Sequence, residues 1–458
     1  MACFDFMTPV QKIRPIATSR RERLLTLAFL GVLAGTVLAF GGAEPAAGSA
    51  AEAIVFLLAI FAVWHSSPEP LRFPWPGIAL LAALLVAEWS VARPAPYRAR
   101  AELLLLAAAV SAFLIAMRVS ESSGMRSLFC GGLLVLCLFE ALYGLAQYLT
   151  GWQQIGAYKK LDYTLMATGT YINPNHFAGL LEMALPLTFA WSLWKFDRLA
   201  EARLAGRSRD SRGLLLTELL TEEGAPVFAF FLFATLVLAA ALIFSRSRMG
   251  IFSALAGIGA VAAGWIAYRR KRPVATGGVS AAILLALVLA GVLSAGAWIG
   301  FGPVLERFRN TESDLPSRVA LWKNTIVLIR AHPLWGTGPG SFEDAYTLLQ
   351  AADFEHRIDH AHNDYLEFAE EWGIPAAGLL FALVGWVLAR AASEFLRARP
   401  SKESMLLLGC CGSLVALLVH SVADFNLHIP ANAFLFAALL GLAWTLSGDL
   451  ASHRTHSE

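Results

Sequence analysis

Hydrophobic residues along this chain gather in long runs that are separated by short polar segments and by one long polar segment. Most runs are about 17–22 residues, which is the length that crosses a bilayer as a helix. They lie at 24–40, 51–64, 77–92, 101–117, 127–149, 175–194, 226–244, 250–268, 278–299, 373–389, 404–420 and 431–447. We therefore predict an all-α polytopic membrane protein with about twelve transmembrane helices. The run at 51–64 is short and has Gly/Pro-rich neighbours, so it is the weakest of the set.

The long polar segment divides the chain. We expect a transmembrane bundle of about nine helices in 1–299, a loop with amphipathic helices in 300–372, and the last three helices in 373–447. A tail of 448–458 follows. Composition agrees with a membrane protein, since 57% of residues are hydrophobic and 15% are charged. A net charge of +2 gives no reason to expect a nucleic-acid partner.

The distribution of basic residues predicts the orientation. If the N-terminus is cytoplasmic, 23 of the 36 lysines and arginines fall in cytoplasmic segments. Leaving aside the long loop, outer segments hold seven. Short cytoplasmic loops are enriched in lysine and arginine, so this bias favours a cytoplasmic N-terminus and an outward 300–372 loop.

Within that loop, the run 317–331 predicts an amphipathic helix. Its expected apolar face is Val319, Trp322, Ile326 and Ile329. Arg318 lies in the first turn, where the helix dipole favours an anion, although a plain surface arginine is equally compatible with the pattern.

A glycine-rich turn is expected after His332-Pro333, at Gly336, Gly338 and Gly340. A second helix is then predicted from Ser341, with Asp344 completing a capping box.

The sharpest polar cluster is HRIDHAHNDYLEF, which contains His356, His360, His362, Asp359 and Asp364. Imidazole and carboxylate ligands suit zinc or manganese, but the spacing matches no zinc-binding helix such as HExxH, so we expect no metal there. His362 precedes a predicted helix, where it is well placed as a general base, since histidine exchanges protons near neutral pH.

That helix carries an acidic stripe, Asp364, Glu367 and Glu371. Such a stripe is more typical of a solvated or salt-bridged face than of catalysis. Three more carboxylates, Glu88, Glu140 and Glu182, fall within predicted spans. A carboxylate inside a membrane span costs free energy, so these residues are candidates for a function. The alternative is that each is buried against a neighbouring helix.

Two short outer segments add further candidates. FSRSRMG places Arg246 and Arg248 in a tight turn between spans, where they either anchor the membrane interface or supply donors to a phosphate. TGTYINPNHF places Asn173, Asn175 and His176 at the mouth of a span. These amides suit sugar hydroxyls or phosphate, and helix capping by Asn173 is the alternative.

Histidines are concentrated on the predicted outer side. Seven of the ten lie in or beside outer segments; they are His176, His332, His356, His360, His362, His420 and His428. The clustering is either accidental or the sign of an outward site assembled from several loops.

Several pieces together resemble the bacterial O-antigen ligase/polymerase family of polytopic glycan transferases. The matching pieces are TGTYINPNHFAGLLEMALPL, SRSRMG, SRVALWKNTIVLIRAHPLWGTGPGSF and HAHNDYLEFAEEWGIPAAGLL, in this order around a long outer loop. The resemblance covers roughly 168–392. One departure is Ala376, where many members have a second glycine after Gly373, and this bears on helix packing.

The resemblance implies a function and roles for residues. It implies transfer of a glycan from an undecaprenyl-diphosphate-linked donor to a hydroxyl acceptor at the periplasmic face of the bacterial inner membrane. The acceptor is lipid A-core, a second lipid-linked glycan or a protein hydroxyl, and neither metal nor other cofactor is needed. By position, Arg246, Arg248 and Arg318 bind the diphosphate, while Arg318 and His362 are catalytic. Asn173, Asn175, His176 and Asn363 are weaker candidates for glycan or acceptor binding.

Two other classes of protein remain open at this point. A secondary transporter also has twelve spans with a cytoplasmic linker between the sixth and seventh. Against it, the polar residues cluster on one side rather than at the midplane, and the halves show no similarity. A metal-dependent outward hydrolase is the other alternative.

Overall fold

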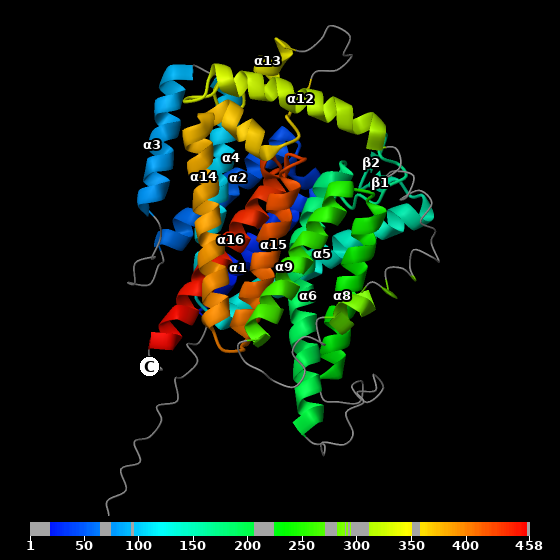
Figure 1. Cartoon of the computed structure of the whole chain (residues 1–458). Coiled ribbons are helices and arrows are strands. Elements are labelled where there is room, and N and C mark those ends of the chain that lie inside the picture. Colours follow the sequence, from blue (N-terminus) through cyan, green and yellow to red (C-terminus); the bar gives the residue numbers. More distant parts are fainter. Residues whose placement is uncertain are drawn as a thin grey trace, which may run out of the picture.

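The computed structural model describes residues 19–64, 75–92, 96–205, 224–270, 282–288, 290–291, 294, 311–349 and 358–455. These residues form a bundle of long helices (Figure 1). Its long helices are α1 (Arg20–Leu38), α2 (Pro45–Trp64), α3 (Trp75–Ala92), α4 (Pro96–Val119), α5 (Ser123–Thr150), α6 (Pro174–Ala205), α8 (Ala225–Phe244), α9 (Arg248–Arg270), α14 (Asp364–Arg397), α15 (Lys402–His420) and α16 (Pro430–Thr455).

Shorter elements connect them. The long loop holds α12 (Thr311–Ala331) and α13 (Phe342–Thr347). Two single 3-10 turns, η1 (Phe40–Gly42) and η2 (Asn426–His428), precede α2 and α16. A small antiparallel ribbon of β1 (Gln154–Ile155) and β2 (Tyr158–Lys159) follows α5.

Among the described residues, nine helices are long and apolar enough to cross a membrane. The all-α polytopic class is therefore confirmed, and α2, the weakest of the predicted spans, is one of the nine. The predicted spans 24–40 and 77–92 are also helical, as α1 and α3, although α3 has only a short apolar part, Gly77–Ala87. Most of the predicted span 278–299 lies outside the described residues.

The core of the bundle is built on α6, α15 and α16. The apolar windows of these helices are 89%, 78% and 78% buried, whereas that of α14 is 28% buried. Helices α9 and α15 approach closely because a glycine of each faces the other: a Cβ added at Gly257 would lie 2.7 Å from the carbonyl oxygen of Gly412. Small residues at such a crossing allow backbones to pack in a membrane.

One end of the bundle collects the loops, and we call it the loop end. Helices α6, α14 and α16 begin there and α15 ends there, since Asp424 of the α15–α16 loop lies beside both His176 and His362. The turn between α8 and α9 is at the same end, because Gly250 packs against Ala178. Helix α12 crosses over this end of the bundle (Figure 1).

The glycine-rich turn of the long loop docks on a break in α14. Gly373 has a φ of 73°, so the helical hydrogen bonding is interrupted there and carbonyls before it become available. The amides of Thr337 and Gly338 donate to the carbonyls of Glu370 and Glu371, both at 2.9 Å. Gly336 is required for this approach, since a Cβ there would lie 2.1 Å from the carbonyl oxygen of Glu371.

One local prediction for the long loop was wrong, and another was only partly right. Ser341 does precede α13, but its hydroxyl donates to the carbonyl of Gly338 at 2.6 Å and makes no cap bond, so the capping box is absent. Of the predicted apolar face of α12, Ile329 is buried and Trp322 is partly buried, whereas Val319 and Ile326 are exposed. The buried face runs through Leu321, Thr325 and Ile329, because Leu321 packs against Phe342 and Tyr346 of the α13 region.

Candidate functional site

The loop between α15 and α16 organises the loop end. Asp364, the first residue of α14, donates its amide to the carbonyls of Ser421 and Asp424 at 2.9 and 3.2 Å. The side-chain amide of Asn363 donates to the carbonyl of Val422 at 2.8 Å. From α12, Arg318 donates to the carbonyl of Ala423 at 2.7 Å. The turn 421–424 is therefore held from both sides by the long loop and α14.

Asp424 is the centre of the first of two clusters at this turn. Its carboxylate is fully buried and faces three imidazoles: His362 Nδ1 at 3.7 Å, His176 Nε2 at 3.9 Å and His420 Nε2 at 3.9 Å. Burial alone would raise the pKa of Asp424, but these three imidazoles lower it well below its usual range. We call these four residues the Asp424 cluster.

His362 is the exposed member of this cluster. Its side chain is 31% exposed, whereas those of His176 and His420 are buried. Its backbone adopts a φ of 49°, which is rare for a residue with a Cβ and costs about 1–3 kcal/mol. The hydrogen bonds from Asn363 and Asp364 to the 421–424 turn hold His362 in this conformation. An imidazole that is reachable from outside and backed by a buried carboxylate can accept a proton.

The arginines predicted to bind an anion reach this end from two elements. Arg318 lies against the 421–424 turn, next to the Asp424 cluster. Arg246 lies in the α8–α9 turn with a φ of 57°, and its guanidinium stacks over the ring of Tyr148 at 5.6 Å. Within the described residues, Arg246 Nε is buried and has no hydrogen-bond partner. Arg248 begins α9. Convergence of the three guanidiniums on one anion stays a prediction.

The polar residues at the start of α6 and α14 have structural partners. Asn173 accepts the amide of Asn175 at 2.9 Å, which supports the capping interpretation. Asn363 caps α14 by accepting the amide of Leu366 at 3.0 Å. The ring of His176 packs against Phe425, with centroids 4.8 Å apart. Their roles in glycan binding stay predictions.

Two of the predicted intramembrane carboxylates are buried against neighbours. Glu182 of α6 pairs with His420 Nδ1 at 2.8 Å, which links it to the Asp424 cluster. Glu140 of α5 accepts the amide and the hydroxyl of Thr170, both at 2.8 Å, and so anchors the segment before α6. The side chain of Glu88 lies outside the described part.

A second cluster surrounds His428 at the other end of the same loop. His428 Nδ1 contacts Asp364 Oδ1 at 3.0 Å, and its Nε2 lies 3.7 Å from Glu367 Oε1. Glu102 and Glu371 lie on the remaining side. We call these five residues the His428 cluster. Burial alone would lower the pKa of His428, but the charges of the surrounding carboxylates raise it well above its usual value.

The acidic stripe of α14 is therefore not solvated. Asp364, Glu367 and Glu371 are each at most 2% exposed. Glu367 accepts from His360 Nδ1 at 2.5 Å and from the amide of Ala361 at 2.8 Å. The prediction of a solvated face was wrong, because the α15–α16 loop covers this face. The prediction of ion pairs holds for Asp364 and Glu367, which each pair with a histidine.

Residues 233–381 match the family described as O-antigen ligase. This matched stretch, about a third of the chain, is similar to the O-antigen ligase family. The matched region contains Arg246, Arg248, Arg318 and His362, and it ends before the loop that holds Asp424. A search of curated proteins found no match.

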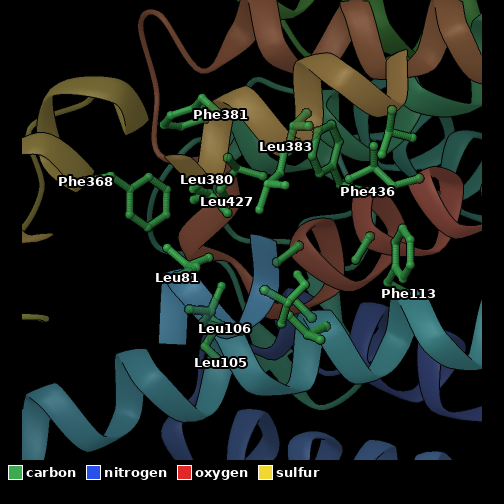
Figure 2. A pocket seen from close by; sticks show the side chains of 18 of the residues that line it. Leu81, Leu105, Leu106, Phe113, Phe368, Leu380, Phe381, Leu383, Leu427 and Phe436 are labelled. Atoms are coloured by element: carbon green, nitrogen blue, oxygen red, sulfur yellow. The ribbon is translucent and has the colours of Figure 1, made fainter. Parts of the chain in front are cut away.

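An apolar cavity of about 150 Å³ lies beside the His428 cluster. Figure 2 shows side chains of α3, α4, α14 and α16 gathered around it, with Phe368 and Leu427 at one side and Phe113 at another. Glu102 is the one charged residue that lines it in the described part of the chain. An apolar cavity with a polar boundary suits part of a lipid chain.

Sequence reasoning missed the central carboxylate of the site. Asp424 was not a candidate, although His420 and His428 on either side of it were counted among the outer histidines. Glu102 was also missed, because it sits in an apolar span with no local motif. Of the seven histidines that the sequence places on the outer side, five gather at the loop end: His176, His360, His362, His420 and His428. His332 is exposed, and His356 lies outside the described residues.

Proposed function

We propose that this protein transfers a glycan from an undecaprenyl-diphosphate-linked donor to a hydroxyl acceptor. The observation that carries the proposal is the meeting of Arg318 and His362 at the turn that holds the buried carboxylate of Asp424. A cation for a leaving phosphate and a base for an incoming hydroxyl are the two groups that such a transfer needs.

The proposed reaction is a displacement at the anomeric carbon of the donor sugar. His362 accepts the proton of the acceptor hydroxyl, and the oxygen forms a new glycosidic bond. The bond between the anomeric carbon and the diphosphate oxygen breaks, and undecaprenyl diphosphate leaves with the electron pair. Arg318, with Arg246 and Arg248, neutralises the negative charge that develops on it. Asp424 stabilises the imidazolium of His362 without itself taking the proton.

The proposed location of the active face is the periplasmic side of the bacterial inner membrane. Basic residues support this orientation at the opposite end of the bundle, where Arg269 pairs with Asp197 and Arg126 pairs with Asp449. Lysine and arginine are enriched on the cytoplasmic side of membrane proteins. The loop end then faces outward, where lipid-linked glycans are presented.

The test is transfer by the purified protein in proteoliposomes that contain the lipid-linked donor and an acceptor. We expect release of undecaprenyl diphosphate together with elongated acceptor. Arg248→Ala, Arg318→Ala and His362→Ala should each abolish transfer while the protein still inserts in the membrane. His332→Ala is the matched control, because His332 is an exposed histidine of the same loop. Retained transfer in all three variants would contradict the proposal.

The same vesicles distinguish glycan transfer from the rival function, solute transport. Flux of a solute in vesicles without any lipid-linked donor would favour a carrier. Hydrolysis of a glycan without transfer to any acceptor, lost on adding a chelator and restored on returning the metal, would favour a metal-dependent hydrolase instead.

The class of acceptor is decided by the glycan phenotype of a strain that lacks the gene. Complete loss of capped lipopolysaccharide would identify lipid A-core as the acceptor and the protein as a ligase. Capping by a single repeat would identify a second lipid-linked glycan as the acceptor and the protein as a polymerase. An unchanged lipopolysaccharide with a lost glycoprotein would identify a protein hydroxyl.

A further inference from the structure

We propose that His428, Glu102 and Glu371 bind one divalent metal ion of the zinc or manganese class at the loop end. One ligand atom from each of these residues can be chosen so that all three lie within 4.8 Å of one another. The residues come from three elements: Glu102 from α4, Glu371 from α14 and His428 from η2. Imidazole and carboxylate groups are ligands that both metals accept.

The orientation of His428 is the first observation behind this assignment. Its side chain is 2% exposed, and Nδ1 contacts Asp364 Oδ1 at 3.0 Å. Within the described residues, the buried Nε2 has no hydrogen-bond partner. Histidines that ligate metals have this arrangement: a carboxylate holds the ring through one nitrogen and leaves the other free to coordinate.

A second unpartnered atom lies in the same group of residues. Glu371 is 2% exposed, and its Oε1 accepts the amide of Phe342 at 3.1 Å. Its Oε2 is buried and lacks a hydrogen-bond partner among the described residues. A buried polar atom without a partner costs free energy, so the Glu371 oxygen and the His428 nitrogen together favour a cation bound between them.

The charge around these ligands also calls for a cation. The strongest electrostatic partners of Glu102 are His428 and His360, together with the carboxylates of Glu367 and Asp364. Those of Glu371 begin with Glu102 and Glu367. Four carboxylates thus share a buried region with two imidazoles. A divalent ion would neutralise two of these charges, and the other way to neutralise them is protonation.

A neighbouring group of residues is less suited to the ion. His360, Glu367 and His428 also offer ligand atoms within 4.8 Å of one another. However, both oxygens of Glu367 already have partners, Oε1 with His360 Nδ1 and Oε2 with the amide of Ala361. The ion is therefore assigned to the side of His428 that faces Glu102 and Glu371.

The proposed ion would connect three parts of the bundle that are distant in sequence. It would hold α4, the segment of α14 before the break at Gly373 and the loop before α16. Glu102 also lines the apolar cavity, so the ion would lie at its polar boundary. This proposal stands whether or not the protein transfers glycans, because it rests only on the His428 cluster.

The test uses the whole protein, purified in detergent and stripped of metals. Zn²⁺ or Mn²⁺ is added alone, excess ion is removed, and retained metal is measured by mass spectrometry. We expect one ion per chain and a higher temperature of thermal unfolding. Glu102→Gln and His428→Gln should each weaken binding at least tenfold. His332→Gln is the matched control, an exposed histidine of the same region that should bind like the wild type.

The conservative Glu102→Gln variant keeps the test decisive if His428→Gln does not fold. Retention by the wild type and His332→Gln, with loss in Glu102→Gln, supports the site. If the wild type retains neither ion and neither raises its unfolding temperature, the proposal is overturned and the carboxylates are neutralised by protons. Equal retention in wild type and Glu102→Gln would also overturn it, because the ion would then bind elsewhere.

Discussion

The two clusters at the ends of the α15–α16 loop have opposite composition. The Asp424 cluster has one carboxylate among three imidazoles, with Arg318 beside it. The His428 cluster has one imidazole among four carboxylates, with His360 beside it. They lie within a few residues of each other along the chain, so their difference comes from the helices that surround them. This difference favours an anion at the first cluster and a cation at the second.

This difference also indicates where the headgroup of the lipid-linked donor would bind. A diphosphate would be repelled by the carboxylates around His428 and attracted to the arginines and imidazoles around Asp424. We therefore propose that the donor headgroup binds on the Asp424 side. The apolar cavity reaches Glu102 on the other side, and we propose that it accommodates an uncharged part of a lipid.

The largest expected effect is from His362→Ala. Loss of the base should lower the rate of transfer by roughly 10²–10⁴-fold, which is the usual contribution of general acid–base catalysis. His332→Ala should stay within twofold of wild type. Initial rates of undecaprenyl diphosphate release measure both. Equal rates in wild type and His362→Ala would remove the Asp424 cluster from the chemistry.

Arg318→Lys tests whether the first cluster needs a guanidinium rather than a charge alone. Lysine retains the positive charge but loses the planar pair of donors, so we expect transfer to fall about 10–100-fold. The hydrogen bond from residue 318 to the carbonyl of Ala423 is also weakened. The readout is kcat and KM for the donor. Wild-type values for Arg318→Lys would show that a simple charge suffices.

Asp364→Asn tests the second cluster through the residue that orients His428. The carboxylate that holds Nδ1 becomes an amide, so we expect the affinity for Zn²⁺ or Mn²⁺ to fall about 10–100-fold. Titration of the stripped protein with metal measures it. An unchanged affinity would mean that Asp364 does not position His428 for coordination.

The Asp424 carboxylate should also contribute stability with a defined dependence on pH. Its pKa in the folded protein is lowered, so its contribution is present at pH values above about 4, the pKa in an unfolded chain, and is lost as the pH falls below that. Asp424→Asn should cost about 1–3 kcal/mol at pH 7 and less at pH 3. Thermal unfolding at several pH values checks this. A difference that grows on acidification would contradict it.

The smallest expected effect is from filling the cavity. Leu106→Trp on α4 narrows the cavity and should raise KM severalfold for long-chain donors or acceptors, with little change for short-chain analogues. Leu57→Trp on the exposed face of α2 is the matched control. Equal KM values for long and short chains in Leu106→Trp would show that no lipid chain occupies the cavity.

Much of the fold and part of the site followed from local pattern. Runs of apolar residues predicted the long helices, because a helix in a bilayer satisfies its own backbone and needs only an apolar surface. His332-Pro333 marked the end of the helix that is α12, and the helix predicted after His362 is the start of α14. His362 and Arg318 were named from their places in helix termini, and the structure brings both to one turn.

Only the tertiary structure decided what surrounds those residues. The acidic stripe of α14 looks solvent-facing by its spacing, yet it is buried because the α15–α16 loop packs over it. Glu102 and His428 are far apart in the chain, and nothing in either segment predicts that they meet. Helical periodicity specifies which side chains share a face of one helix, whereas the packing of α4, α14 and α16 determines which faces meet. That packing places an imidazole-rich and a carboxylate-rich cluster at the two ends of one short loop.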